Sequence, residues 1–344
     1  MRKLILKNTQ SPGDILMLTA AVRDLHRCCP GQFLTDVRTP SPGLWENNPW
    51  IVKMPDDEPG VERIDCQYPL IQRSNQTPFH FLHGFCAFLS GELGVHIQPT
   101  EFRGDIHLAD REKSWMSQVQ EIVGMRVPFW IVVSGGKYDF TAKWWDVDRY
   151  QQVVDHFDGR ILFVQVGERS HYQPPLHNVI DLRGKTDIRQ LVRLVHHSQG
   201  VLCPVTFLMH LAAAVPVRGG EPKNRPCVVV AGGREPPHWE AYPHHQFIHT
   251  VGSLRCCDNG GCWKSRAVPL GDGDPKDLPA NLCVDVVGKL PRCMDMITAD
   301  EVIRRIGMYF SGGVIAELRN DEACAARQAI EKSNSRALAA VAAG

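Results

Sequence analysis

The chain has 344 residues, of which 43% are hydrophobic and 22% charged, as in a globular protein long enough to fold as two domains. Lysine plus arginine and aspartate plus glutamate both number 38, so the formal net charge is zero. This balance argues against a partner held by overall charge, such as a nucleic acid or an anionic membrane surface.

Apolar runs in the chain are short. None approaches the roughly 18 residues of a transmembrane helix, so we expect no membrane span. The start, MRKLILKNTQSPGD, has too short an apolar run for the core of a signal peptide, and we therefore expect a cytoplasmic protein. In a reducing compartment the 12 cysteines would be thiols or metal ligands rather than disulfides.

An α/β unit is predicted at the beginning of the chain. Residues 4–8 (LILKN) are predicted as a short apolar strand, and the turn at 9–14 leads into a helix that ends before Pro30. Residues 79–95 are predicted as another helix. We therefore expect a Rossmann-like domain over residues 1–125, with the joint to the next domain near 110–128.

A longer pattern of alternating strands and helices follows. The strands are expected at 130–134, 160–166, 179–182, 200–203 and 227–231, and the helices at 147–157, 188–197 and 209–215. Such alternation predicts a parallel sheet and a second Rossmann-like domain, which we place at 126–310. An Ala-rich tail over 311–344 is expected to be helical from 315 to 342. The predicted fold class is thus α/β, with two Rossmann-like domains facing across a cleft.

Asp14 directly follows Gly13, where the first strand leads into a helix. In open α/β sheets, ligands bind at the carboxyl ends of the strands, so this carboxylate can face a cleft. It can equally cap the helix as its N-cap residue, and the spacing leaves both interpretations open.

The turn SGGKYDFTAKWW after the strand at 130–134 places Lys137, Thr141 and Lys143 close together. Its glycines permit close backbone approach, and lysines supply point charges for a phosphate. The GxxxxGK[ST] spacing of a P-loop is absent. Ordinary solvated lysines are the alternative.

Thr206, Met209 and His210 lie where another strand runs into a helix of small residues. The free amides and positive dipole end of a helix N-terminus favour a bound anion. An ordinary buried helix, with His210 in the core, is equally compatible with the pattern.

Glu235, Trp239 and Glu240 follow the glycine pair of the strand at 227–231. The carboxylates can accept hydrogen bonds from sugar hydroxyls, and the indole can stack on a ring. A rigid turn without a ligand is the alternative.

Cysteines cluster near the C-terminus. Four sulfurs suit tetrahedral zinc or mononuclear iron, and the candidate ligands are Cys257, Cys262, Cys283 and Cys293. Cys256 can replace Cys257, because adjacent residues rarely ligate one ion in such a closed site. The intervening loop LGDGDPKDLPAN is acidic, rich in Gly and Pro and unable to build a core, so a metal would stabilise this knuckle over residues 256–293.

Other interpretations of this segment stay open. The cysteines can be buried free thiols or, less in keeping with a reducing compartment, disulfides. Three aspartates in the loop invite a calcium site without the ligand series of an EF-hand: Asp272, Asp274 and Asp277.

Together these stretches resemble the heptosyltransferase family of GT-B glycosyltransferases, known for adding ADP-activated heptose to lipopolysaccharide. GDILMLTAAVRDLHRCCPG is similar to the opening block of that family. Four later stretches resemble further blocks in the same order, over residues 1 to about 250: NNPWIV, KWWDVDRYQQVV, LRGKTDIRQLVRLVHHS and MHLAAAV.

Three more stretches resemble a narrower branch, the autotransporter heptosyltransferases: FRGDIHLADREKSW, AGGREPPHWEAYPHH and CCDNGGCWKSR. Members of that branch transfer heptose to serine hydroxyls of bacterial surface proteins and carry a four-cysteine iron-binding finger. The resemblance implies one structural ion, iron or zinc, on the cysteines. It also implies an inverting reaction, for which we expect no catalytic divalent metal because lysines and helix amides can hold the diphosphate.

The resemblance also assigns roles. Asp14 would be the general base for the acceptor hydroxyl, Lys143 with Lys137 would hold the donor diphosphate, and Thr206 would complete the phosphate cradle. Met209 and His210 would lie beside the donor.

The chain departs from the family at one point. The segment VTFL at 205–208 stands where the family usually has Asp-Ser/Thr-Gly-Pro, so a carboxylate assigned to the donor sugar is missing. Glu235 or Glu240 would have to supply it.

The predicted function is transfer of a sugar to a hydroxyl acceptor. The favoured sugar is heptose, with ADP-heptose as its donor. A protein serine is favoured over a small molecule as acceptor, and homo-oligomerisation is open. A nucleotide-sugar epimerase of GT-B type and a non-catalytic, metal-stabilised scaffold of the same fold are the alternatives.

Overall fold

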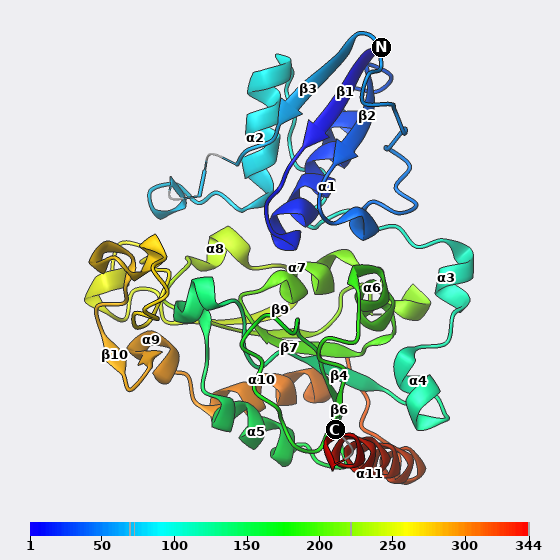
Figure 1. The fold of residues 1–344 in the computed structure, drawn as a ribbon, viewed down its shortest axis with the longest axis vertical. Coiled ribbons are helices and arrows are strands. Elements are labelled where there is room, and N and C mark those ends of the chain that lie inside the picture. Colours follow the sequence, from blue (N-terminus) through cyan, green and yellow to red (C-terminus); the bar gives the residue numbers. More distant parts are fainter. Residues whose placement is uncertain (69, 72, 221, 343–344) are drawn as a thin grey trace.

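The N-terminal part of the chain forms a small parallel sheet. Its strands lie in the order β2-β1-β3, and both neighbouring pairs are parallel: β1 (Arg2–Lys7), β2 (Phe33–Arg38) and β3 (Val61–Asp65). This computed structural model describes residues 1–68, 70–71, 73–220 and 222–342. Two helices share a core with this sheet, α1 (Pro12–Cys28) and α2 (Leu82–Leu93) (Figure 1).

A six-stranded parallel sheet forms the C-terminal part, in the order β6-β5-β4-β7-β8-β9. Its strands are β4 (Phe129–Val132), β5 (Leu162–Gln165), β6 (Val179–Asp181), β7 (Gly200–Pro204), β8 (Cys227–Gly232) and β9 (His245–His249). This is the strand order of the doubly wound Rossmann fold. The order in which strands are added reverses between β4 and β7: β5 and β6 extend the sheet on one side of β4, and β7, β8 and β9 extend it on the other. Ligands of such sheets bind at the carboxyl ends of the strands at this point.

Helices cover both faces of this sheet, as Figure 1 shows. α6 (Ile188–His197) and α7 (Phe207–Ala214) pack on the face toward the N-terminal sheet, together with Ile131 of β4. α5 (Val147–His156) and α10 (Ala299–Ser311) pack on the other face with Trp130 and Val132. Neighbouring residues of β4 therefore serve opposite layers, as the period of a strand requires.

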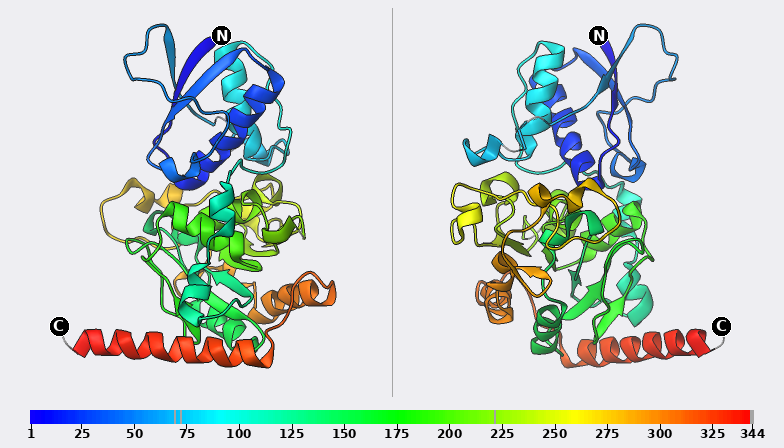
Figure 2. Two further views of the ribbon diagram at one scale, coloured as in Figure 1. Left: turned by 90° about the vertical axis from the view of Figure 1, so that its right-hand side faces the viewer. Right: turned by 60° about the vertical axis from the view of Figure 1, so that its left-hand side comes forward.

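Shorter elements complete the chain. α8 (Pro237–Glu240) follows β8, and a small cysteine-rich segment contains the hairpin β10 (Val286–Val287) and β11 (Leu290–Pro291) and the helix α9 (Arg292–Asp295). α11 (Asn320–Ala342) lies across the end of the molecule that is remote from the N-terminal sheet (Figure 2). Among the described residues, no helix combines the length and apolarity needed to cross a bilayer.

The predicted parallel α/β architecture is confirmed, with local differences. The strands β2, β3 and β9 and the helix α10 were not expected. α3 (Asp110–Ser114) and α4 (Gln118–Val123) occupy the segment where a joint between domains was expected. The tail helix begins at Asn320 rather than at 315, and the last two residues of the expected tail, 343–344, lie outside the described residues.

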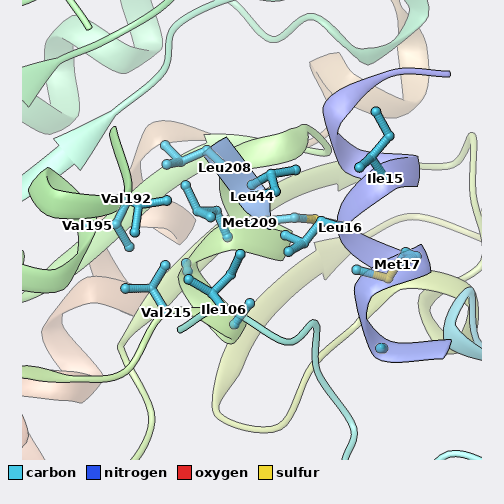
Figure 3. Packing of buried hydrophobic residues seen from close by; sticks show 14 of the residues in the cluster. Ile15, Leu16, Met17, Leu44, Ile106, Val192, Val195, Leu208, Met209 and Val215 are labelled. Carbon is cyan, nitrogen blue, oxygen red and sulfur yellow. The ribbon is translucent and has the colours of Figure 1, made fainter. Parts of the chain in front are cut away.

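One apolar core continues from the N-terminal helices into the C-terminal sheet. Figure 3 shows Leu16 of α1 beside Met209 of α7, and both side chains are fully buried. Gly104 permits this close packing, since a Cβ there would lie 2.8 Å from the side chain of Leu16 and 3.2 Å from that of Ala214. The packing fixes the first turn of α1 relative to the second sheet.

A buried ion pair ties the same two parts together. Arg189, in the first turn of α6, donates from Nε and Nη2 to the two carboxylate oxygens of Glu112 in α3, at 2.7 and 2.6 Å. Its Nη2 also donates to the carbonyl of His107 at 2.7 Å. The two side chains are only 12% and 5% exposed, so their charges are largely removed from water.

We predict that Arg189→Ala lowers the free energy of unfolding by about 3 kcal/mol, because it leaves the Glu112 carboxylate buried without its cation. The exposed pair of Arg304 and Glu301 provides the control, and Arg304→Ala should cost less than about 1 kcal/mol. Urea unfolding of the three proteins measures both values. Equal losses in the two variants would contradict the importance of this tie.

Candidate functional site

Polar residues from both parts of the chain meet at the carboxyl edge of the six-stranded sheet. Asp14 comes from the first turn of α1, directly after β1, while Lys143 follows β4. Glu235 and Glu240 follow β8. Electrostatic interactions link Asp14, Lys143 and Glu240 to one another, so the structure brings these predicted residues together from both parts of the chain.

Asp14 is half-buried in the first helical turn. The backbone N–H of Ser11 donates to its Oδ2 at 3.0 Å, so Ser11 and not Asp14 occupies the N-cap position. Burial raises the pKa of Asp14, and the Tyr68 hydroxyl, the Ser11 amide and the charge of Lys143 partly offset this rise. A carboxylate with a raised pKa is a stronger base than an exposed aspartate and suits proton abstraction.

Lys143 faces a buried carboxylate. Its Nζ lies 2.9 Å from Oε1 of Glu235, and Arg234 contacts the same oxygen through Nη1. Burial lowers the pKa of Lys143 to about 8 and that of Arg234 to about 10. Two cations thus converge on one oxygen in a largely dry site.

Glu235 and Glu240 each carry one unsatisfied oxygen. Both residues are 4% exposed, and the Oε2 atom of each is buried without a hydrogen-bond partner within the described ranges. Burial raises the pKa of Glu240, and the charges of Lys143 and Arg234 oppose that rise. Because a buried acceptor without a donor is costly, these oxygens are suited to receive hydrogen bonds from a ligand such as a polyol.

The other predicted polar residues make structural contacts nearby. Lys137 donates from Nζ to the Oγ of Ser11 at 2.7 Å, which bridges the two parts of the chain three residues from Asp14. Thr141 accepts a hydrogen bond from the amide of Ala267 at 2.8 Å, so its hydroxyl anchors the cysteine-rich segment. Thr206 is the N-cap residue of α7, and its Oγ1 accepts from the amide of Leu208 at 3.3 Å.

Three of the residues that were predicted to contact the sugar donor have side chains that are buried in the protein core. Met209 is fully buried between α1 and α7 (Figure 3), and His210 donates or accepts at 2.7 Å through Nδ1 with the hydroxyl of Tyr242. Trp239 is 1% exposed and stacks on Phe81 with ring centroids 5.0 Å apart. These side chains are at most 4% exposed in the free protein, and their contacts with the donor stay predictions.

Arg234 and Tyr68 are the residues of this cluster that the sequence did not single out. Arg234 stands directly before Glu235 in a turn that was recognised, so its charge was a usable signal. Tyr68 lies in a segment without a motif, and only the fold brings its hydroxyl to Asp14.

The cysteine-rich segment encloses a small cavity of about 10 Å³. Its lining includes Cys256, Cys262, Cys283 and Cys293. Burial raises the pKa of Cys293 to about 12, and the thiols of the other three add to this shift. Within the described part of the chain, however, no group of three or more His, Cys, Asp or Glu side chains stands close enough to hold a metal ion.

Cys256 lines this cavity and Cys257 does not. The thiol of Cys257 is instead within hydrogen-bonding distance of the carbonyls of Leu254 and Thr250, at 3.4 and 3.6 Å. The potential ligands around the cavity are thus four thiols and the carboxylate of Asp285, and thiolates suit iron or zinc.

The aspartates of the neighbouring loop surround an arginine. The guanidinium of Arg266 donates to Asp272 at 2.8 Å and to Asp277 at 2.5 Å, and it lowers the pKa of both carboxyls. Asp274 pairs with Lys276 at 3.1 Å. These pairs occupy the oxygens that a calcium ion would need.

No protein-family model matches the chain, and no curated protein matches it in sequence. Solved structures do share its fold. A family 9 glycosyl transferase from Veillonella parvula is 14% identical, with a TM-score of 0.57 over 89% of this chain and 96% of that protein. The ADP-heptose lipopolysaccharide heptosyltransferase II of E. coli is 13% identical, with a TM-score of 0.54 over 91% of this chain and all of that protein.

The third similar structure is TibC from enterotoxigenic E. coli, described as a dodecameric, iron-containing heptosyltransferase in complex with ADP-D-β-D-heptose. It is 15% identical, with a TM-score of 0.60 over 90% of this chain and 76% of TibC. At such low identity the likeness concerns the fold. The chain therefore has the two-part α/β fold of GT-B glycosyltransferases.

Proposed function

We propose that the protein is an inverting glycosyltransferase that moves heptose from ADP-heptose to a hydroxyl acceptor, with a protein serine as the favoured acceptor. The observation that carries this proposal is the interaction of Asp14 with the half-buried Lys143, which lies beside the buried Arg234 at the carboxyl edge of the second sheet. The fold shared with proteins described as heptosyltransferases supports it.

In the proposed reaction the acceptor oxygen bonds to the anomeric carbon as the bond from that carbon to the diphosphate breaks. The acceptor proton goes to the Asp14 carboxylate. Lys143 and Arg234 stabilise the charge that grows on the ADP leaving group, and Lys137 and the N-terminal amides of α7 beside Thr206 add to this stabilisation. Attack from the side opposite the leaving group inverts the anomeric centre.

Glu235 and Glu240 are the proposed contacts for the sugar hydroxyls. Each offers a buried Oε2 without a partner among the described residues, and hydroxyl donors would satisfy both. They would replace the carboxylate that the segment 205–208 lacks relative to the heptosyltransferase pattern.

We also propose a structural metal on Cys256, Cys262, Cys283 and Cys293, with Cys256 in place of the predicted Cys257. The small cavity that these four residues line supports the choice. An ion there would cross-link a segment with little apolar core and leave the sugar transfer to other residues. Homo-oligomerisation and a cytoplasmic location stay predictions.

The central test is transfer itself. Incubation of candidate acceptor proteins with the enzyme and ADP-heptose should add one heptose unit per site, as measured by intact mass. Asp14→Asn should lower kcat about 10²- to 10⁴-fold, because the base is lost, while ADP binding by calorimetry stays within about threefold. Asp300→Asn, at the start of the distant helix α10, is the control and should keep full activity.

Unchanged turnover in Asp14→Asn would refute the role of the base. Consumption of the nucleotide sugar without any acceptor would instead favour the epimerase, and no consumption at all would favour the scaffold.

The dependence of kcat/KM on pH should be bell-shaped. It should rise as Asp14 loses its proton, above the usual aspartate range because burial raises that pKa. It should fall as pH increases through about 8, where Lys143 loses the charge that holds the diphosphate. In Lys143→Arg the alkaline limb should disappear, since arginine stays protonated. An alkaline limb that is identical in this variant would contradict the assignment.

The metal proposal predicts about one iron or zinc ion per purified chain. Cys283→Ser should lose the ion and lower Tm by several degrees, because a cross-link in the segment is removed. Cys324→Ser, at an exposed cysteine of α11, should keep both the ion and the Tm. Elemental analysis and thermal unfolding give the two readouts, and retention of the ion by Cys283→Ser would rule out this ligand set.

A further inference from the structure

The carboxylate of Glu235 is ion-paired with the two cations on which the proposed donor site depends. Its Oε1 lies 2.9 Å from Nζ of Lys143 and also contacts Nη1 of Arg234. Glu235 is therefore bound in the way that a phosphate oxygen would be bound, with two positive charges on one anionic oxygen.

The second oxygen of Glu235 shows that this arrangement is not optimised for the free protein. Oε2 is buried and has no hydrogen-bond partner among the described residues. A buried acceptor without a hydrogen bond costs free energy, because it has lost the hydrogen bonds that water would make with it. The pairing of Glu235 with the cations therefore carries a free-energy cost, as expected of a group that has an alternative position or partner.

A diphosphate cannot join this cluster without a change. Asp14 and Glu240 already interact electrostatically with Lys143, and Asp14 also interacts with Lys137, so the cluster already holds three carboxyl groups beside its cations. Adding the charges of a diphosphate beside Glu235 would bring like charges together in a medium of low dielectric, which is strongly unfavourable.

The residue before Glu235 is held in place by the cysteine-rich segment. The carbonyl of Arg234 accepts from the amide of Trp263 at 3.0 Å, and Nε of Arg234 donates to the carbonyl of Lys264 at 2.6 Å. Arg234 is consequently held in place by several contacts, whereas the hydrogen bonds and ion pairs of the Glu235 carboxylate within the described residues are those with Arg234 and Lys143.

We propose that Glu235 is an internal counter-ion, which occupies Lys143 and Arg234 in the free protein and is displaced from them by the diphosphate of the donor. This inference rests on the proposed function, and it concerns how that site controls the affinity for its donor. The carboxylate competes with the ligand, so it lowers donor affinity and keeps both cations ordered when no donor is bound.

The first experiment compares the binding of ADP and of inorganic pyrophosphate to wild type and to Glu235→Gln. Glutamine keeps the shape of glutamate without its charge, so both ligands should bind about 10-fold more tightly or better. Asp300→Asn is the control, because Asp300 lies at the start of α10, outside the cluster of charges. The gain in this control should be clearly smaller.

The outcomes distinguish a failure of this inference from a failure of the proposed function. If wild type binds ADP and Glu235→Gln binds it equally or more weakly, Glu235 positions the cations or the donor, and the counter-ion inference is overturned. If neither protein binds ADP or pyrophosphate, the proposed function fails and the inference fails with it.

A second measurement uses the unaltered protein, in case Glu235→Gln does not fold. In a crystal structure with bound ADP, Lys143 and Arg234 should contact phosphate oxygens, and the 2.9 Å pair between Lys143 and Glu235 should be broken. An intact pair beside bound ADP would overturn the inference.

Discussion

The packing of α1 on α7 is the contact on which the rest of the site depends. A Cβ on Gly13 would lie 3.5 Å from the ring of His210, so the first turn of α1 rests directly on the helix that follows β7. Leu16 and Met209 close the contact from the apolar side (Figure 3). Because the contact excludes water, the charge of Lys143 acts on the carboxylates through a medium of low dielectric. A looser contact would weaken all of these interactions together.

The cysteine-rich segment connects this site to the N-terminal part. Its amides at Cys262 and Trp263 donate to the carbonyls of Gly233 and Arg234, at 3.2 and 3.0 Å. At the same time Asn75 accepts from the amide of Gly261 and from the indole of Trp263, at 3.0 and 2.9 Å. One small segment therefore fixes the backbone that carries a cation and holds a loop of the other part against it. A brace of this kind explains why a segment so poor in apolar residues has a place beside the site.

The sequence predicted the helices and strands in which apolar residues recur at a regular spacing, and it missed those without such a spacing. The helix Ile188–His197 was predicted to the residue, since its polar and apolar faces are cleanly separated. The strand His245–His249 (HQFIH) was missed, because polar residues at most positions give no apolar run. The segment FLMHLAAA is apolar almost all round, so no pattern could tell that Met209 and His210 face the core rather than the cleft. Tyr68 enters the site only through contacts between distant segments, which local patterns do not encode, whereas Arg234 stands beside Glu235 in a turn that the sequence had already singled out.

The charges of the cluster also couple the two halves of the proposed reaction. The positive charge of Lys143 holds the pKa of Asp14 below the value that burial alone would give. When a diphosphate neutralises Lys143, this restraint weakens, the pKa of Asp14 rises further, and the carboxylate becomes a stronger base. Base strength therefore increases when a donor is present to receive the acceptor oxygen. Without a donor the charges of Lys143 and Lys137 offset part of the rise in the pKa of Asp14 that burial causes, so the electrostatics that bind the leaving group also act on the acceptor side.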